Sequence, residues 1–293
     1  MQKRSYFMTK KSHNLWTWVP HLFLFHKERV FRKLTPIMIV LAVYAIIIGL
    51  CFKGRGSYNL GQFHLIFSFI LAIIIGFRVN TSYSRWWEGR TLWGSIVNNC
   101  RNLALKFDTY VGLNQYPEFP KLLGKLPIVL KAKLRDDNEL LQETMQSLGI
   151  TEYDAKQPVI LIAQRLYGIV HQLRNETRVR VEQCSHLDNH ISNLLDMVGG
   201  CERIAKTRVP PAYAFFVKQA LLFYSLMFPF GWIHSFGILV IPMMVMIVYI
   251  LLGLEIVSEE LEDPFRICDN GLNLGAITRT IESNIAQIAR EKS

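Results

Sequence analysis

The sequence predicts an all-α membrane protein in which four transmembrane helices per subunit continue into a cytosolic helical bundle. Two observations carry this prediction. Of the 293 residues, 51% are hydrophobic and only 19% are charged, and the apolar residues are gathered in blocks, unlike the mixed pattern of a soluble domain. Residues 34–52, 56–77 and 219–254 contain no Asp, Glu, Lys or Arg. Because a bilayer core about 30 Å thick needs roughly 20 apolar helical residues, the composition excludes a purely soluble enzyme, a disordered chain and a disulfide-rich secreted module.

The first two blocks each fit one transmembrane span, and the third block fits two. The third block is 36 residues long, which is too long for a single span. Pro229, Gly231 and Gly237 near its middle are typical of a turn that would divide it. The four expected spans are about Leu34–Cys51, Asn59–Phe77, Pro211–Trp232 and Phe236–Leu254.

The third expected span contains one charged residue, Lys218. A Lys at the centre of a transmembrane helix costs about 2.5–3.5 kcal/mol on insertion scales. We therefore expect Lys218 near a helix end, or facing protein or water.

The distribution of basic residues predicts the topology. Lys and Arg number eight in residues 1–33, eighteen in 78–210 and four in 266–293, whereas the two short loops hold only Lys53 and Arg55. The positive-inside rule places both termini and the central region in the cytoplasm. The expected organisation is a cytosolic N-terminal segment (1–33), a transmembrane hairpin (34–77), a cytosolic helical region (78–210), a second hairpin (211–254) and a cytosolic C-terminal segment (255–293). The net charge of +10 follows from this topology, and no basic–aromatic motif indicates nucleic acid.

The central region is expected to be helical. Leu187, Ile191, Leu194 and Val198 follow helical spacing with polar residues between them, and no alternating strand pattern stands out. Residues 158–175 have a similar pattern. We expect breaks at 117–127, which Pro117 and Pro127 bound, and at Gly199–Gly200.

One pair of residues could bind a metal ion. His186 and His190 would share a helix face, but the pair lacks the Glu of an HExxH motif and a visible third ligand. We interpret it as part of a solvated helix, and keep a membrane-bound metalloenzyme as an alternative. The five cysteines form no CxxC or zinc-type spacing. We expect no metal, no cofactor and no enzymatic activity.

Four carboxylates follow the fourth expected span. Two interpretations stay open for them: they face an ion, singly or as a ring in an oligomer, or they pair with basic residues nearby, since acids at a helix C-terminus oppose its dipole. The candidate ion-facing acids are Glu259, Glu260, Glu262 and Asp263.

The second expected span places Phe69, Ile73 and Phe77 on one face, because they are four residues apart. In a monomer such a face only packs. In a symmetric oligomer with this helix on the axis, each position becomes a ring, and stacked apolar rings form a hydrophobic constriction. After this span, Arg85 and Trp86–Trp87 suit a membrane–water interface as helix anchors.

Several stretches together resemble the bacterial bestrophin family over nearly the whole chain. The stretches are Gly76-Phe77-Arg78 with Asn80, Ser82-Tyr83-Ser84-Arg85-Trp86, Glu88, Arg90 and Leu92-Trp93-Gly94, then Pro210 with Ala212-Tyr213, and finally Glu259-Glu260-Leu261-Glu262-Asp263-Pro264-Phe265.

The resemblance implies a homopentameric ion channel in the bacterial inner membrane, with monovalent ions, the lipid bilayer and its own copies as partners. It implies a pore neck at Phe69, Ile73 and Phe77, a cytosolic aperture at Val209, and a water-filled vestibule between them. Animal members carry an acidic calcium clasp after the Pro-Phe pair. Here that segment, residues 266–271, has one acidic residue, so we expect no calcium gating of that type.

The sign of the permeant ion stays open. The central region holds 18 basic and 14 acidic residues, which favours anions, whereas the acids after the fourth span would favour cations if they faced the pathway. The family holds anion channels, and its bacterial members can pass cations. We lean to chloride, with a sodium or potassium channel of the same fold as the alternative. A secondary transporter is more distant, because the 133-residue insert between the hairpins does not fit two related halves.

Overall fold

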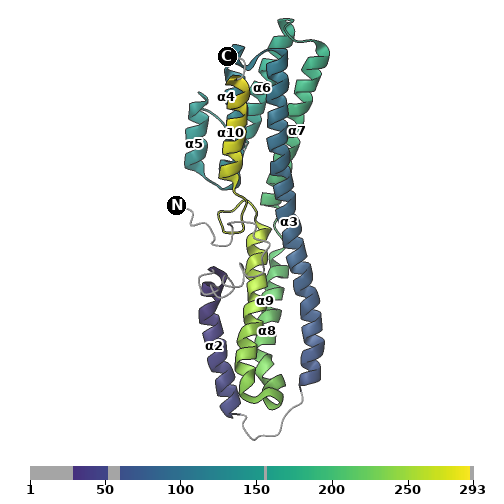
Figure 1. Cartoon of the computed structure of the whole chain (residues 1–293), viewed down its shortest axis with the longest axis vertical. Coiled ribbons are helices and arrows are strands. Elements are labelled where there is room, and N and C mark those ends of the chain that lie inside the picture. The colour runs from purple at the N-terminus through teal and green to yellow at the C-terminus, as the bar shows by residue number, and fades with distance from the viewer. Residues whose placement is uncertain (1–28, 52–59, 155–156, 291–293) are drawn as a thin grey trace, which may run out of the picture. The chain divides into compact units, whose positions relative to one another are not determined.

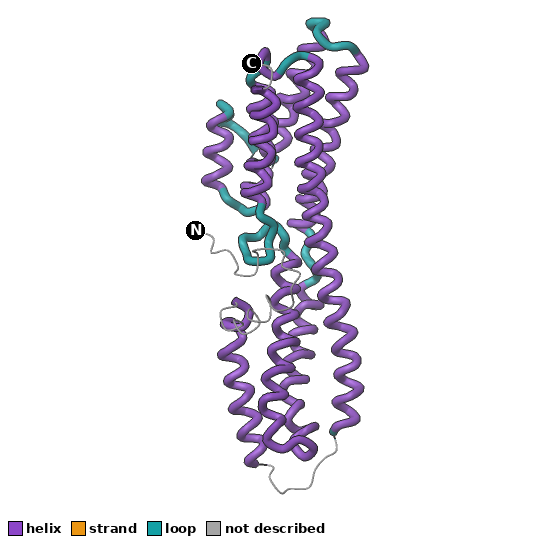
Figure 2. Tube along the Cα trace, viewed as in Figure 1, coloured by secondary structure: helices purple, strands orange, loops and turns teal. Residues whose placement is uncertain are grey.

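The computed structural model describes residues 29–51, 60–154 and 157–290. These residues form helices connected by loops, with no strand among them (Figures 1 and 2), as the sequence predicts. They fall into two compact units. Unit 1 comprises the described residues within 1–84 and 208–262, and unit 2 those within 85–207 and 263–293.

Unit 1 is built from the apolar helices. They are α2 (Arg29–Cys51), the first part of α3 (Gly61–Tyr110), α8 (Pro211–Phe236) and α9 (Val240–Glu262). Helix α2 packs against α8 and α9, where Leu34, Leu41 and Ala45 are buried and the Tyr44 hydroxyl donates to the Leu226 carbonyl at 3.0 Å.

Three helical segments of the described chain are long and apolar enough to cross a membrane. They are Arg29–Cys51, Gly61–Tyr110 and Pro211–Glu262. The last is 52 residues long, and a 3₁₀ turn (η3, Gly237–Leu239) divides it into α8 and α9. The expected division of the third apolar block into two helices is therefore present.

The turn lies later than the sequence predicted. Helix α8 continues past Trp232 to Phe236, with Pro229 buried inside it. Neighbouring packing allows a proline inside an apolar helix, so Pro229 does not end this one. The reversal occurs at Gly237, whose φ of +52° suits a residue without a Cβ.

Unit 2 comprises the second part of α3 and five further helices. The five are α4 (Glu118–Leu134), α5 (Asn138–Ser147), α6 (Pro158–Asn175), α7 (Val181–Lys206) and α10 (Leu274–Arg290). Helix α4 packs against α5, α6 and α10. Its Phe119 ring stacks on Phe107 of α3, with the ring centroids 3.7 Å apart.

The helical periodicity predicted for unit 2 is confirmed, but two expected breaks are wrong. The four apolar residues predicted to share a face of α7 are all buried, and α6 covers residues 158–175 as expected. However, α7 runs through Gly199–Gly200 to Lys206. A Cβ on Gly200 would lie 3.0 Å from Leu92 of α3, so this glycine permits a close helix approach. The chain does turn before Pro117, but Pro127 lies inside α4. Its neighbours Leu126 and Ile128 are buried with it, and this packing offsets the one helical hydrogen bond that a proline, without an N–H, cannot donate.

Candidate functional site

The three predicted neck residues lie on an uncovered apolar face of α3. In the single chain the exposed fractions are 69% for Phe69, 45% for Ile73 and 65% for Phe77. The other side of the helix is in the core of unit 1, where Leu71 and Ile75 are 2% and 6% exposed. Helix α3 therefore has one apolar side packed in its own subunit and a second apolar side open.

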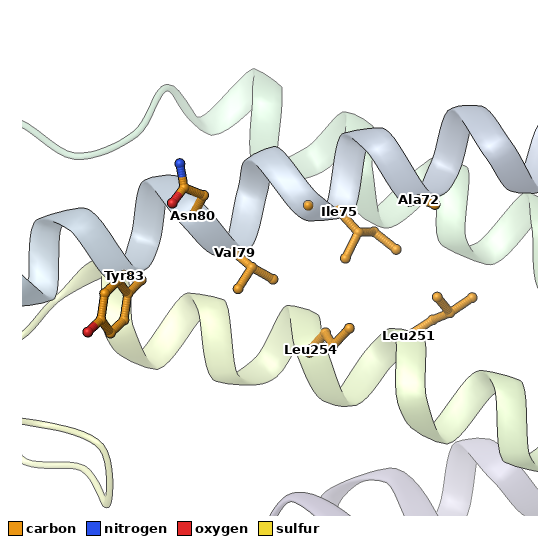
Figure 3. A pocket seen from close by; sticks show the side chains of 8 residues that line it. Ala72, Ile75, Val79, Asn80, Tyr83, Leu251 and Leu254 are labelled. Atoms are coloured by element: carbon orange, nitrogen blue, oxygen red, sulfur yellow. The ribbon is translucent and has the colours of Figure 1, made fainter.

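An open groove of about 540 Å³ lies beside this face, between α3 and α9 (Figure 3). Its lining is mainly apolar, and Asn80 and Tyr83 are its polar members. The remaining lining residues are Ala72, Ile75, Gly76 and Val79 of α3 with Leu251 and Leu254 of α9. Its apolar lining is of the kind that another apolar helix or a lipid chain covers.

A buried group of charges joins α3 to α9 one residue beyond Phe77. Arg78 is 1% exposed. Its Nη1 lies 2.8 Å from Glu262 Oε2, and its Nε lies 3.4 Å from Glu255 Oε2. Burying charge in an apolar unit is costly unless the charges are paired. With one guanidinium facing two carboxylates, this group carries a net formal charge of about −1.

Further polar atoms lie buried on the same two helices. Ser82 and Ser258 are both fully buried. Among the residues that the structure describes, neither hydroxyl has a hydrogen-bond partner, nor has Glu255 Oε1. Ser82 is four residues after Arg78, and Ser258 lies between the two glutamates. The buried polar residues therefore lie along one face of each helix.

No role for Arg78 or Glu255 followed from the sequence. Both were visible as the charged residues that end an apolar block, and opposite charges at the ends of two spans are a signal for pairing. The sequence does not show which transmembrane spans pack against each other, so the pair could not be identified from it.

The predicted aperture residue, Val209, is linked to the same charged group. Val209 precedes Pro210 and the start of α8, and it is partly buried. Its backbone N–H donates to Glu262 Oε1 at 3.1 Å. Glu262 therefore contacts both the aperture segment and Arg78.

Two other predicted ion-facing acids are paired with cations of unit 1. Glu259 Oε2 lies 3.3 Å from Lys218 Nζ, and Glu260 Oε1 lies 3.5 Å from Lys33 Nζ. Lys218 is in the second turn of α8, close to a helix end as expected. Asp263 is partly buried and begins the second chain segment of unit 2. The pairing interpretation of these acids accordingly gains support for Glu259, Glu260 and Glu262.

The predicted interface anchors have protein partners in unit 2. Arg85 donates through Nη1 to the Thr207 carbonyl and through Nη2 to the Ile204 carbonyl, both at 2.7 Å. Trp86 Nε1 donates to the Asn270 carbonyl at 2.8 Å, and Trp87 is 56% exposed. Their role as membrane anchors stays a prediction, and Arg85 has a structural role that the sequence did not indicate.

The two histidines considered as metal ligands contact neutral polar groups. His190 Nδ1 lies 2.5 Å from Asn99 Oδ1, and His186 Nδ1 lies 3.3 Å from the Tyr110 hydroxyl. Burial, together with the positive charge of Lys106, lowers the pKa of His190. Within residues 29–51, 60–154 and 157–290, no three His, Cys, Asp or Glu side chains are grouped to hold a metal ion.

Similarity to known proteins agrees with the resemblance read from the motifs. Residues 8–287 match the model of a family described as Bacterial/Fungal Bestrophin protein. A voltage-dependent anion channel-forming protein of Nostoc sp. is 31% identical over 229 residues, which is 74% of each chain. The voltage-dependent anion channel-forming protein of Salmonella typhi is 27% identical over 94% of this chain and 92% of its own.

Solved structures share the fold. A crystal structure of a bacterial bestrophin homolog from Klebsiella pneumoniae, carrying one mutation, matches with a TM-score of 0.77 at 26% identity, over 90% of this chain and 100% of that one. A second structure of the homolog from this organism matches with a TM-score of 0.76 at 27% identity, over 89% and 98%. With the family model covering nearly the whole sequence, the chain belongs to the bacterial and fungal bestrophin family.

Proposed function

We propose that the chain forms a homopentameric ion channel in the bacterial inner membrane, with both termini in the cytoplasm and a preference for anions such as chloride. The observation that carries the proposal is the open apolar face of α3, on which Phe69, Ile73 and Phe77 lie. A closed ring of copies with α3 on its axis turns each of these positions into a ring of side chains. The groove between α3 and α9 is then available to the next copy.

The rings form a neck that controls conduction through hydration. A bare monovalent ion entering a low-dielectric medium pays of order 20 kcal/mol in the idealised limit, and Phe and Ile cannot coordinate it. The neck therefore conducts when it is wide enough for the ion to keep its water, and closes by dewetting. The edges of Phe69 and Phe77 are weakly positive and favour anions if they point inward.

Two observations favour anions. Relatives along most of the chain are named anion channel-forming proteins. In addition, Glu259 and Glu260 lie near lysines, which reduces their field on a pathway. A monovalent cation channel of the same fold is the alternative, and it draws on the excess carboxylate charge beside Arg78.

The test is the reversal potential of the purified protein in a planar bilayer with asymmetric KCl. Discrete currents that reverse near the chloride potential support the proposal. Reversal near the potassium potential would replace it by the cation alternative. Discrete unit currents also exclude a secondary transporter or a metalloenzyme as the main function, and a purified assembly that never conducts under any applied voltage would contradict the channel.

A further inference from the structure

We propose that Glu262 is a positioning residue that ties the Val209 aperture to the pore helix through Arg78. The inference rests on the proposed function, since it assumes that Phe77 and Val209 both line the ion pathway. Glu262 lies at neither constriction, and the proposal gives it the role of connecting the neck to the aperture.

The connection is continuous in unit 1. One oxygen of the Glu262 carboxylate, Oε2, lies 2.8 Å from Arg78 Nη1, and the other, Oε1, accepts the Val209 N–H at 3.1 Å. Arg78 follows Phe77 directly on α3. A single side chain from the end of α9 thus contacts the residue after the third predicted neck ring and the backbone of the predicted aperture.

No backbone donor follows the Val209 N–H before α8 begins. The next two residues are Pro210 and Pro211, and proline has no N–H. Val209 therefore offers the last backbone donor before α8 begins. A carboxylate that accepts this donor fixes the aperture residue at one point of the chain.

The surroundings make the link stiff. Arg78 is 1% exposed, and the side chain of Glu262 is 15% exposed. Separating Arg78 from Glu262 would break an ion pair between two largely buried charges, which is unfavourable. When α3 shifts to widen the neck, Arg78 moves Glu262 and the Val209 backbone with it. The two constrictions are expected to change together.

Glu255 supplies a matched control. It pairs with the same guanidinium, Nε to Oε2 at 3.4 Å, and lies on the same helix. Glu255→Ala and Glu262→Ala each remove one carboxylate and each leave Arg78 with one remaining glutamate. Only Glu262→Ala removes the acceptor of the Val209 N–H.

The experiment uses the full-length protein in lipid nanodiscs and planar bilayers, with two measurements. The first is hydrogen–deuterium exchange of a peptide covering residues 207–213. The second is the chloride-to-potassium permeability ratio of Glu262→Ala, Glu255→Ala, Val209→Ala and the double variant Val209→Ala/Glu262→Ala. We expect Glu262→Ala to speed exchange at Val209 and Glu255→Ala to leave it unchanged. Both variants remove one negative charge beside Arg78, so the link predicts a larger change of the permeability ratio in Glu262→Ala than in Glu255→Ala.

The double variant measures the coupling. If Glu262 acts through Val209, its effect on the permeability ratio shrinks about twofold or more once Val209 is Ala, as for residues of one hydrogen-bond network. Glu262→Gln keeps an acceptor oxygen and is expected to restore part of the wild-type ratio.

The outcomes separate this proposal from the proposed function. If Val209→Ala alters permeability but Glu262→Ala does not, the link is overturned and the channel proposal stands. Faster exchange in Glu262→Ala without any change in permeability also overturns it, because the bond would then be structural only. If Val209→Ala changes nothing in a conducting channel, the aperture assignment fails and the link fails with it.

Discussion

At the scale of single residues, His64 and Gly231 illustrate how the core of unit 1 accommodates a polar ring. His64 is 2% exposed and packs edge-on against Tyr224 and Phe228, with ring centroids 5.0 and 5.7 Å apart. A Cβ on Gly231 would lie 2.5 Å from His64 Cδ2. The glycine is needed for this approach of α8 to α3, and its backbone conformation is ordinary helix.

Gly231→Ala is therefore expected to destabilise the protein by about 1–3 kcal/mol, the usual cost of overpacking a core. The measurement is thermal unfolding in detergent. In a His64→Ala background, Gly231→Ala should cost less stability than it does in the wild type, because the clashing ring is gone. Equal destabilisation by Gly231→Ala in both backgrounds would mean that the ring is not what the new methyl group meets.

A second residue-scale prediction concerns the middle of the neck. Ile73→Ala removes most of one apolar ring and is expected to raise the current. A barrier lowered by about 1.4 kcal/mol gives about a tenfold increase, and we expect an effect of that order in single-channel recordings.

Ile46 of α2 provides the matched control, because its exposed fraction of 44% is close to the 45% of Ile73. Under the proposed function Ile46 faces lipid or a neighbouring helix away from the ions, so Ile46→Ala should leave the current unchanged. A similar rise in both variants, at equal expression, would remove the basis for placing Ile73 in the neck.

At the scale of helices, Arg85 of α3 caps the C-terminal end of α7. The last carbonyls of a helix lack partners within it, and Arg85 donates to two of them, at Ile204 and Thr207. A positive charge there also suits the helix dipole. The forked guanidinium of Arg can reach both carbonyls at once, which the single ammonium of Lys cannot.

Arg85→Ala is expected to loosen the last turn of α7 by about 1 kcal/mol, seen as faster hydrogen exchange over residues 202–207. Arg85→Lys should retain part of the protection. Arg90→Ala removes an exposed Arg from α3, the helix that carries Arg85, and should leave exchange in the last turn of α7 as in the wild type. Unchanged exchange in Arg85→Ala would show that the turn is held by other contacts.

Glu202 connects helices α4 and α7 and gives unit 2 a pH dependence. Burial alone would raise the pKa of its carboxyl, but Lys133 at 2.6 Å and Lys206 at 3.2 Å outweigh burial and lower the pKa below its ordinary 4.5. A carboxyl with a lowered pKa stabilises the fold above the unfolded-state pKa and loses that contribution as the pH falls through the folded-state pKa.

Glu202→Gln is thus expected to be less stable than the wild type by about 1 kcal/mol at pH 7. The difference should shrink as the pH falls below 4.5, the ordinary value of this carboxyl. The measurement is denaturant unfolding of both proteins over this range. A difference that stays constant with pH would assign the effect to side-chain packing and not to charge.

The helices were largely predictable, because helical periodicity and uncharged blocks are local properties of the sequence. Helix α6 and the buried face of α7 are examples. The expected breaks at Gly199–Gly200 and Pro127 failed for a different reason: whether a glycine or proline ends a helix depends on its neighbours in space, such as Leu92 against Gly200.

The candidate site was predictable only in part for the same reason. The exposed stripe of Phe69, Ile73 and Phe77 follows from their spacing on one helix. The link from Arg78 to Glu262 joins residues far apart in the chain, and the bond from Val209 to Glu262 requires knowing where the chain returns after α7. The acids after the fourth expected span, which lie at the end of α9 and just beyond it, were noticed, but the lysine partners of Glu259 and Glu260 were not.

At the scale of the whole molecule, the assembled channel should expose the α3 face to water and not to lipid. This distinction is testable because the native thiols can be controlled. Cys51 is exposed and Cys268 partly exposed, whereas the remaining cysteines are buried. Burial raises the pKa of the Cys201 thiol to about 12, which keeps it unreactive toward thiol reagents.

In a Cys51→Ser/Cys268→Ser background, Phe77→Cys is expected to react with a water-soluble methanethiosulfonate reagent, and the bulky adduct should reduce the current by most of its value. Val40→Cys on α2 is the matched control. Val40 is 67% exposed in the single chain and Phe77 is 65% exposed, but a thiol that faces lipid stays protonated and out of reach of the reagent. Block of the Phe77→Cys channel alone would support α3 at the axis of a closed ring. Equal inertness of both thiols in a conducting channel would mean that the α3 face is covered by lipid or protein, and that the ions pass elsewhere.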